Sequence, residues 1–281
     1  MKVRFPKFDF STIQAHWTRV PEFAQRANSA SLSPAYIEPY LLKVMNQAKP
    51  LLDKQDKALA AELDIFIKQE MQHCRQHLNF NKRLHELGYT SVLPVEKKFE
   101  DDYNRFLATK PLRFNLAYAE GFESLSATSC EQYFEDFDEY LEGAHPEPTN
   151  MWRWHLAEEW EHRTVCSDVY HKLSGLNPVF RYFYRLYGYF YAVVHISTFI
   201  TRTSKLLLDQ DRAMMTPDEL KVALARDKLV KKVLARRFIS TAFMICSPFY
   251  DPKNRRKPKG YDEYLKSFEA KYDREAAAVA A

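Results

Sequence analysis

The sequence predicts an all-α protein. Only 6 of its 281 residues are glycine, which argues against a β-sandwich or a Rossmann domain, because both need many tight turns. The long segments are dominated by Glu, Lys, Leu, Ala and Arg, which are good helix formers. Hydrophobic residues make up 46% of the chain, enough for one substantial core.

The first helix signal follows an irregular N-terminal segment, residues 1–32. Ser33 and Pro34 are typical of a helix start, with Ser as the N-cap and Pro in the first turn. Pro39 predicts an early kink or a delayed start of this helix, because a proline inside a helix removes a hydrogen bond. Pro50 is expected to end it.

Three further helices are expected before residue 145. They cover residues 51–87, 95–107 and about 111–135. The first of them has no Gly or Pro and stops before Gly88, a residue type favoured just after a helix. Thr149 or Asn150 is then expected to cap a helix that runs to Gly175.

The C-terminal part has a different composition. Residues 178–207 are rich in Phe and Tyr, and Thr216 with Glu219 forms a capping box that opens a helix to about Phe238. Residues 205–260 hold 14 Lys/Arg against 6 Asp/Glu. We therefore expect one domain, 1–281. Its metal-binding helix bundle is residues 33–175, and the aromatic, basic helices of residues 176–281 pack on that bundle as a lid.

Charge, cysteine usage and hydropathy limit the binding partners and the cellular compartment that the sequence predicts. The net charge of +4 is small, and without an RNA-binding motif it predicts no nucleic-acid partner. The four cysteines are far apart, which predicts reduced thiols and a cytoplasmic protein. The most hydrophobic stretch, residues 186–200, is too short to span a bilayer, although a peripheral membrane contact stays open. Nothing in the sequence predicts the oligomeric state.

Two Glu-x-x-His patterns carry the functional signal. They are Glu70 with His73 and Glu159 with His162, each inside a long helical segment. Residues three apart share one face of a helix, so each pattern presents a carboxylate beside an imidazole. Two such helices, joined by helices that bring further Glu residues, make the ligand set of a dinuclear carboxylate site.

Further candidate residues lie at nearby positions. His155 precedes Glu159 by four residues, so it falls on the same helix face as that pattern. On the helix expected at 111–135, Glu120 and Glu123 are three apart, and both could face the site. Glu38 is the acidic residue beside Pro39 near the first helix start, where it also suits the helix dipole.

The chain resembles the ferritin-like di-iron carboxylate proteins and, more closely, the family of predicted metal-dependent hydrolases. The resemblance covers about residues 33–175 and rests on four segments: Glu38 with Pro39, Phe66 to Asn81, Glu123 to Ala127, and Trp154 to His162. The additional histidine resembles the ligand set of di-iron p-aminobenzoate N-oxygenases. Carried over by position, the resemblance implies these metal ligands: Glu38, Glu70, His73, Glu123, His155, Glu159 and His162.

The leading functional hypothesis is a di-iron oxidase or oxygenase. Two Fe ions, or Mn in their place, would be charge-balanced by four Glu and completed by His. O2 would be the co-substrate, a small amine or apolar molecule the substrate, and an electron donor a partner. The alternatives are a two-metal hydrolase that activates water and a non-catalytic iron-binding helical protein.

Overall fold

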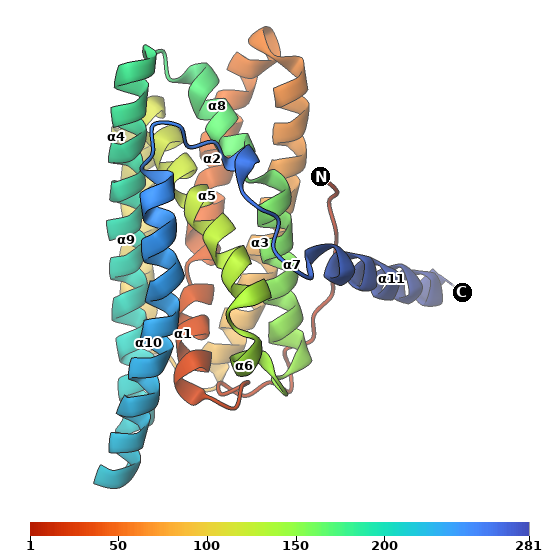
Figure 1. Ribbon diagram of the computed structural model, residues 1–281. Helices are drawn as coiled ribbons and strands as arrows, with labels where there is room; N and C mark the ends of the chain where they lie inside the picture. The colour runs from red at the N-terminus through yellow and green to blue at the C-terminus, as the bar shows by residue number, and fades with distance from the viewer. Residues whose placement is uncertain (281) are drawn as a thin grey trace.

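The computed structural model describes residues 1–280, with the side chains of residues 1–52 and 54–271. Within this range every regular element is a helix, so the predicted all-α class is confirmed (Figure 1). The elements are α1 (Pro21–Ser31), α2 (Pro34–Gln55), α3 (Lys57–Glu86), α4 (Leu93–Thr109), α5 (Leu112–Glu135), α6 (Asp138–Leu141), α7 (Pro146–His162), α8 (Val165–Leu173), α9 (Pro178–Arg212), α10 (Pro217–Ile245), the 3-10 turn η1 (Pro252–Asn254) and α11 (Tyr261–Ala280).

Four helices surround the centre of the molecule. Helix α2 packs along α3, and α5 packs along α7, while α3 also contacts α7 and α2 contacts α5. Helix α9 lies against α5 and α1, and α10 runs beside it in the opposite direction (Figure 1). The short helix α8 closes one end against α3 and α5. The C-terminal helices thus pack on the central helices, while the division of the chain into one domain stays a prediction.

The N-terminal half departs from the expected boundaries. Residues 21–31, expected to be irregular, form α1, which packs on α9 and α3. Helix α2 runs through both Pro39 and Pro50 and ends only at Gln55. Its buried face keeps it helical at a cost of one hydrogen bond for each proline. The break falls at Asp56, whose side chain accepts a hydrogen bond from the Leu59 N–H and caps α3.

The helix expected from residue 149 or 150 to Gly175 is two helices. Helix α7 begins at Pro146, after His145, whose ring nitrogen accepts a hydrogen bond from the Glu147 N–H. It ends at His162, and α8 starts three residues later at Val165. The prediction missed this start because histidine is a rare N-cap.

Helix α5 and helix α9 approach each other at two glycines. A Cβ atom on Gly188 would lie 2.5 Å from the backbone of Ala117, and one on Gly121 would lie 2.7 Å from the Cα atom of Tyr189. Any larger residue would push the two helices apart. The few glycines of this chain are therefore used for contact between helices as well as for turns such as Gly88, where φ is +93°.

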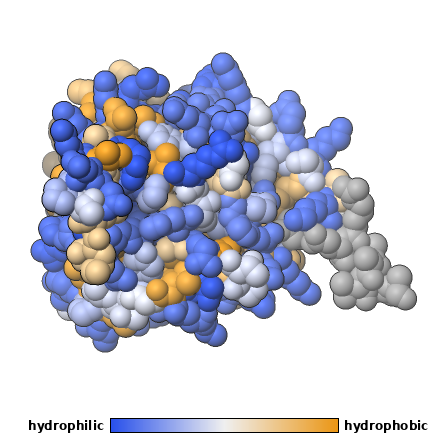
Figure 2. All heavy atoms as spheres, turned by 90° about the horizontal axis from the view of Figure 1, so that it is seen from below, coloured by the Kyte–Doolittle hydropathy of each residue, from blue (hydrophilic) through white to orange (hydrophobic). Residues whose placement is uncertain are grey.

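The surface carries scattered apolar groups. Figure 2 looks at the end of the molecule from below the view of Figure 1 and shows hydrophobic residues in small groups among hydrophilic ones. In the part of the chain that the structure describes, no helix is long and apolar enough to cross a membrane.

Candidate metal centre

The two Glu-x-x-His patterns face each other across the molecule's interior. Glu70 and His73 project from α3, and Glu159 and His162 project from α7. All four side chains are completely buried. Their helical spacing places each pair on one face, as expected, and the His73 Nδ1 atom lies 3.6 Å from an oxygen of both Glu70 and Glu159.

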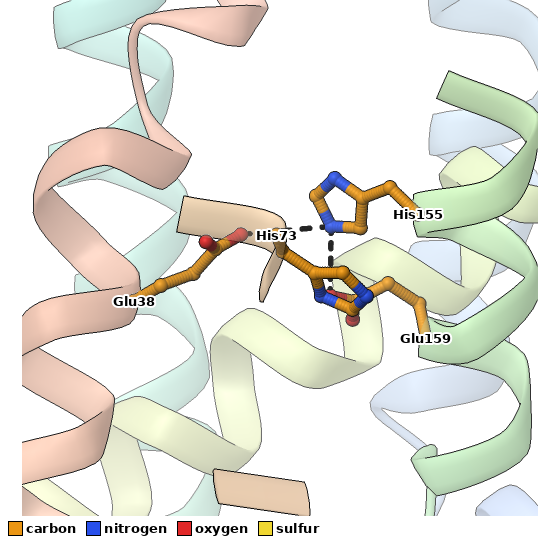
Figure 3. Close-up of side chains that lie close together, drawn as sticks. All are labelled: Glu38, His73, His155 and Glu159. Atoms are coloured by element: carbon orange, nitrogen blue, oxygen red, sulfur yellow. Dashed lines mark hydrogen bonds and ion pairs between the residues drawn. The ribbon is translucent and has the colours of Figure 1, made fainter. Parts of the chain in front are cut away.

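A first cluster forms where α2 meets these two helices. It contains Glu38, His73, His155 and Glu159, each with one ligand atom within 4.8 Å of the others. The His155 Nε2 atom is 2.9 Å from Glu159 and 3.6 Å from Glu38. Figure 3 shows Glu38 reaching from α2 toward His155 and Glu159, which stand one turn apart on α7.

A second cluster lies beside the first and includes α5. It contains Glu70, Glu123, Glu159 and His162, again within 4.8 Å of one another. The His162 Nε2 atom is 3.2 Å from Glu70, 3.5 Å from Glu123 and 3.4 Å from Glu159. Glu159 belongs to both clusters, so its carboxylate is placed to bridge two ions. The structure thus brings together all seven residues that the sequence analysis named.

The choice between Glu120 and Glu123 was open in the sequence. Glu123 lies in the second cluster, whereas Glu120 is outside both. Glu120 instead forms a buried ion pair with Arg185 of α9 at 3.4 Å and accepts a hydrogen bond from Ser124. Glu123 is therefore the α5 carboxylate that can reach a metal ion, and Glu120 helps to hold α9 on α5.

Many buried ligand atoms of the two clusters lack a partner that a pair of ions would supply. Most of the atoms that point into the clusters have no hydrogen-bond partner: both oxygens of Glu38, Glu70 and Glu123, Oε2 of Glu159, Nδ1 of His73 and Nε2 of His162. Leaving so many buried polar atoms unpaired is costly. Two divalent cations would satisfy them and would match the charge of four carboxylates. The residues therefore fit a dinuclear metal centre.

The outer nitrogens of two ligand histidines are fixed by neighbours. With Nδ1 of His73 facing the cluster, its Nε2–H donates to Glu158 at 3.0 Å. With Nε2 of His162 facing the cluster, its Nδ1–H donates to the Gln69 carbonyl at 3.0 Å. Each contact keeps a proton on the outer nitrogen, so the inner nitrogen is the one that would bind a metal ion, which is a recurring arrangement in metalloproteins.

His155 is held by a longer chain of hydrogen bonds. Its Nδ1–H can donate to Nε2 of His77 at 2.6 Å, and the His77 Nδ1–H can donate to the Ser31 hydroxyl at 2.7 Å. Ser31 in turn donates to the Asn81 amide oxygen at 2.9 Å. Every donor in this chain has an acceptor when both imidazoles are neutral, so the chain selects the tautomer in which His155 presents Nε2 to the cluster.

An arginine from the N-terminal segment belongs to the outer layer, the residues that hydrogen-bond the ligand histidines or their partners. Arg4 binds Glu158 at 3.0 Å and Glu161 at 2.8 Å, both on α7. Glu161 also accepts a hydrogen bond from the Gln69 side chain at 2.9 Å. The Arg4 guanidinium thus neutralises the carboxylates that stand behind His73 and His162.

The four cluster carboxylates differ in their proton affinity. Burial, followed by the neighbouring Glu70, raises the pKa of Glu38 well above its usual range. Burial and Glu159 do the same to the pKa of Glu123. Burial also opposes ionisation of Glu159, but His162 and His155 outweigh it and hold its pKa well below the usual range. Without metal, Glu38 and Glu123 therefore carry protons while Glu159 is ionised.

The four histidines of the centre and its surroundings also differ in the direction of their pKa shifts. Burial disfavours the charged form of His73, yet its hydrogen bonds to Glu158 and Glu70 raise its pKa to about 9. Burial also disfavours the charged form of His162, but the neighbouring Glu159 outweighs it and raises the pKa of His162 well above its ordinary value. Burial, reinforced by a neighbouring histidine, lowers the pKa of His155 and of His77. His155 and His77 are thus neutral, as the hydrogen-bond chain requires.

Several residues of the outer layer were not singled out in the sequence. His77 and Glu158 are both buried, and each is hydrogen-bonded to a ligand histidine. Gln69 was missed, although it precedes Glu70 directly. Arg4 and Ser31 had no local signal, because they come from segments read as irregular.

Comparison with known proteins gives one family. Residues 2–256 match the family described as a predicted metal-dependent hydrolase. No curated protein and no solved structure matched the chain. The match extends well past residue 175, the end of the segments that resembled this family in the sequence.

Proposed function

The chain belongs to the predicted metal-dependent hydrolase family, and from this premise we propose that it is a dinuclear iron enzyme that uses O2. In this proposal α2, α3, α5 and α7 form a ferritin-like four-helix core, since each brings one carboxylate to the centre. Those four carboxylates are Glu38, Glu70, Glu123 and Glu159. The observation that carries the proposal is the pair of buried clusters that share Glu159.

Burial of the clusters supports oxygen chemistry. None of the seven side chains is more than 3% exposed. O2 is small and apolar, so it can reach a packed interior that a large polar ester could not enter. Bound at the clusters, two ferrous ions would supply two of the four electrons that reduce O2 to water, while the substrate or an electron donor supplies the others.

The walls of the centre favour an apolar substrate or a small amine. The Trp154 ring stands 4.9 Å from the ring of His73, and the Phe66 ring stands 4.7 Å from that of His162. Trp152 stacks at 5.9 Å on His155. These rings exclude water from the ligands and keep the imidazoles in place, while the outer hydrogen bonds fix which nitrogen faces the metal.

The test is anaerobic loading with Fe²⁺, followed by metal analysis and by O2 consumption on mixing with aerated buffer. We expect two Fe ions per chain and rapid uptake of O2. Glu70→Gln should lose metal and O2 uptake, whereas Glu62→Gln, an exposed position on the same helix, should retain both. A protein that binds no Fe²⁺ would rule out the proposal.

A two-metal hydrolase is the second candidate, and the description of the family favours it. In that case the ions would activate water and polarise a carbonyl or phosphoryl oxygen. Turnover of ester or phosphoester substrates under argon with Mn²⁺ or Zn²⁺, together with Fe²⁺ protein that is stable in air, would establish this alternative. Iron binding without either activity would indicate a non-catalytic iron-binding protein.

A further inference from the structure

The outward face of α9 is apolar over its first half. Phe183, Tyr187, Phe190 and Val194 are spaced three and four residues apart and are between 46% and 65% exposed. From Pro178 to Thr198, no exposed side chain of this helix is charged. An exposed row of large apolar groups is unusual on a monomeric protein and indicates contact with something else.

The end of α10 extends this apolar face. The Tyr182 hydroxyl donates to the Cys246 carbonyl at 2.8 Å, which holds the start of α9 beside the end of α10. Near that end, Ile239, Phe243 and Phe249 are 56%, 78% and 90% exposed. Helices α9 and α10 both pack on α1 and α5 and run beside each other on the left side of Figure 1. The sides of the two helices turned away from α1 and α5 are therefore neighbours.

Unpaired cations lie along the same face of α10. Lys228, Lys232 and Arg236 are exposed, and among the described residues none forms an ion pair with them. On the helical wheel they share the outward side of Ile239 and Phe243. The exposed side chains of residues 228–249 include no acidic group. This surface, made by residues 178–198 and 228–249, therefore combines large apolar groups with positive charge, while the exposed Asp209, Asp218 and Glu219 lie on the other halves of the two helices.

We propose that this surface, the outward side of residues 178–198 and 228–249, docks on an anionic lipid surface. Apolar side chains can enter the boundary between headgroups and acyl chains, while lysines and arginines bind anionic headgroups. A second copy of this chain fits less well, because self-association would bring the same cations together. Since no described helix can cross a bilayer, the contact is peripheral.

The experiment is flotation of the full chain with lipid vesicles. The probes are vesicles of phosphatidylcholine alone and vesicles with about 30% phosphatidylglycerol. We expect binding to the anionic vesicles only, and release at about 1 M salt, where the Debye length is short. Equal binding to both vesicle types, or binding to neither, would overturn the proposal.

Paired variants distinguish binding through this surface from non-specific binding to lipid. Lys228→Glu with Lys232→Glu should weaken binding to anionic vesicles by at least about tenfold, and Phe183→Ser with Phe190→Ser should reduce it similarly. The controls change exposed residues elsewhere and should bind like the parent chain: Lys43→Glu with Lys54→Glu, and Leu51→Ser with Leu93→Ser.

Two further measurements exclude misfolding and self-association as causes of a change in binding. Circular dichroism establishes that each variant keeps the helical content of the parent chain. Light scattering reports the mass in solution. If the parent chain is a dimer and the Phe183→Ser, Phe190→Ser variant is a monomer, the face binds a second copy and the lipid proposal is wrong.

Discussion

The two clusters of the candidate metal centre share Glu159 but are not equivalent. The first cluster has two histidines and two carboxylates, whereas the second has one histidine and three carboxylates. The difference comes from His155, which adds a nitrogen donor to one side only. Oxygen donors suit harder ions and nitrogen donors suit Fe and its neighbours, so the two positions should differ in affinity and in the ion they prefer.

The outer layers differ as well. His162 of the second cluster rests on Gln69, an amide that is itself bonded to Glu161. In the first cluster, His155 depends on a second imidazole, His77, and on the polar side chains behind it. His155 is thus supported by a longer chain of neutral groups than His162, and we expect its position to be easier to perturb selectively.

The largest effect should come from the residue that the clusters share. Glu159→Ala removes a ligand from both positions, so we expect loss of both ions and of O2 uptake. Metal analysis after anaerobic Fe²⁺ loading measures the result. Glu62→Ala, at an exposed site on α3, is the control. A variant that keeps two ions would show that Glu159 does not bridge.

A smaller effect should separate the two positions. His155→Ala removes a donor from the first cluster alone, so the bound iron should fall from two ions per chain toward one. His171→Ala, an exposed histidine on α8, should leave the iron content unchanged. Loss of both ions from the His155 variant would mean that the positions bind cooperatively rather than independently.

The pH dependence of metal binding should be steep. Without metal, Glu38 and Glu123 are protonated by burial, and His73 and His162 are charged. Each ion must then displace protons from its ligands, so affinity for metal falls as pH falls. The slope should flatten as pH approaches about 9, where His73 loses its proton. Calorimetry with Mn²⁺ in buffers of different ionisation enthalpy counts the protons, and uptake that is independent of pH would contradict this assignment.

The smallest expected effect is a loss of metal affinity at the first cluster alone. His77→Phe keeps a ring beside His155 but removes the acceptor of its Nδ1–H. We expect about a 10- to 100-fold loss of affinity for one ion, with the other unaffected. Competition with a chromophoric chelator resolves two binding constants. If both constants change equally, the hydrogen-bond chain does not act through His155.

The central parts of this structure could be predicted because they follow from helical periodicity. A spacing of three residues places Glu70 with His73, and Glu159 with His162, on shared faces whatever the rest of the chain does. His155 follows from the same rule. The choice of Glu123 over Glu120 did not follow, because it depends on the ion pair that Arg185 forms from another helix.

The rest could not be predicted because it depends on contacts between distant segments. Helix α2 passes through Pro39 and Pro50, since its packing outweighs local preference. Gly188 of α9 packs against the backbone of α5, and no local pattern indicates such an approach. Ser31 supports His155 through His77 only after α1 has packed on α3.

The contacts of Arg4 also set an order of events during biosynthesis. Its guanidinium binds Glu158, Glu161 and Glu269, which follow it in the chain by 154, 157 and 265 residues. The ribosome therefore exposes Arg4 long before it makes any of these partners. We therefore expect the N-terminal segment to close behind His73 and His162 only after α7 has been made and has packed. Any metal ions should then enter before or during this last closure, while the carboxylates of the centre can still be reached from solution.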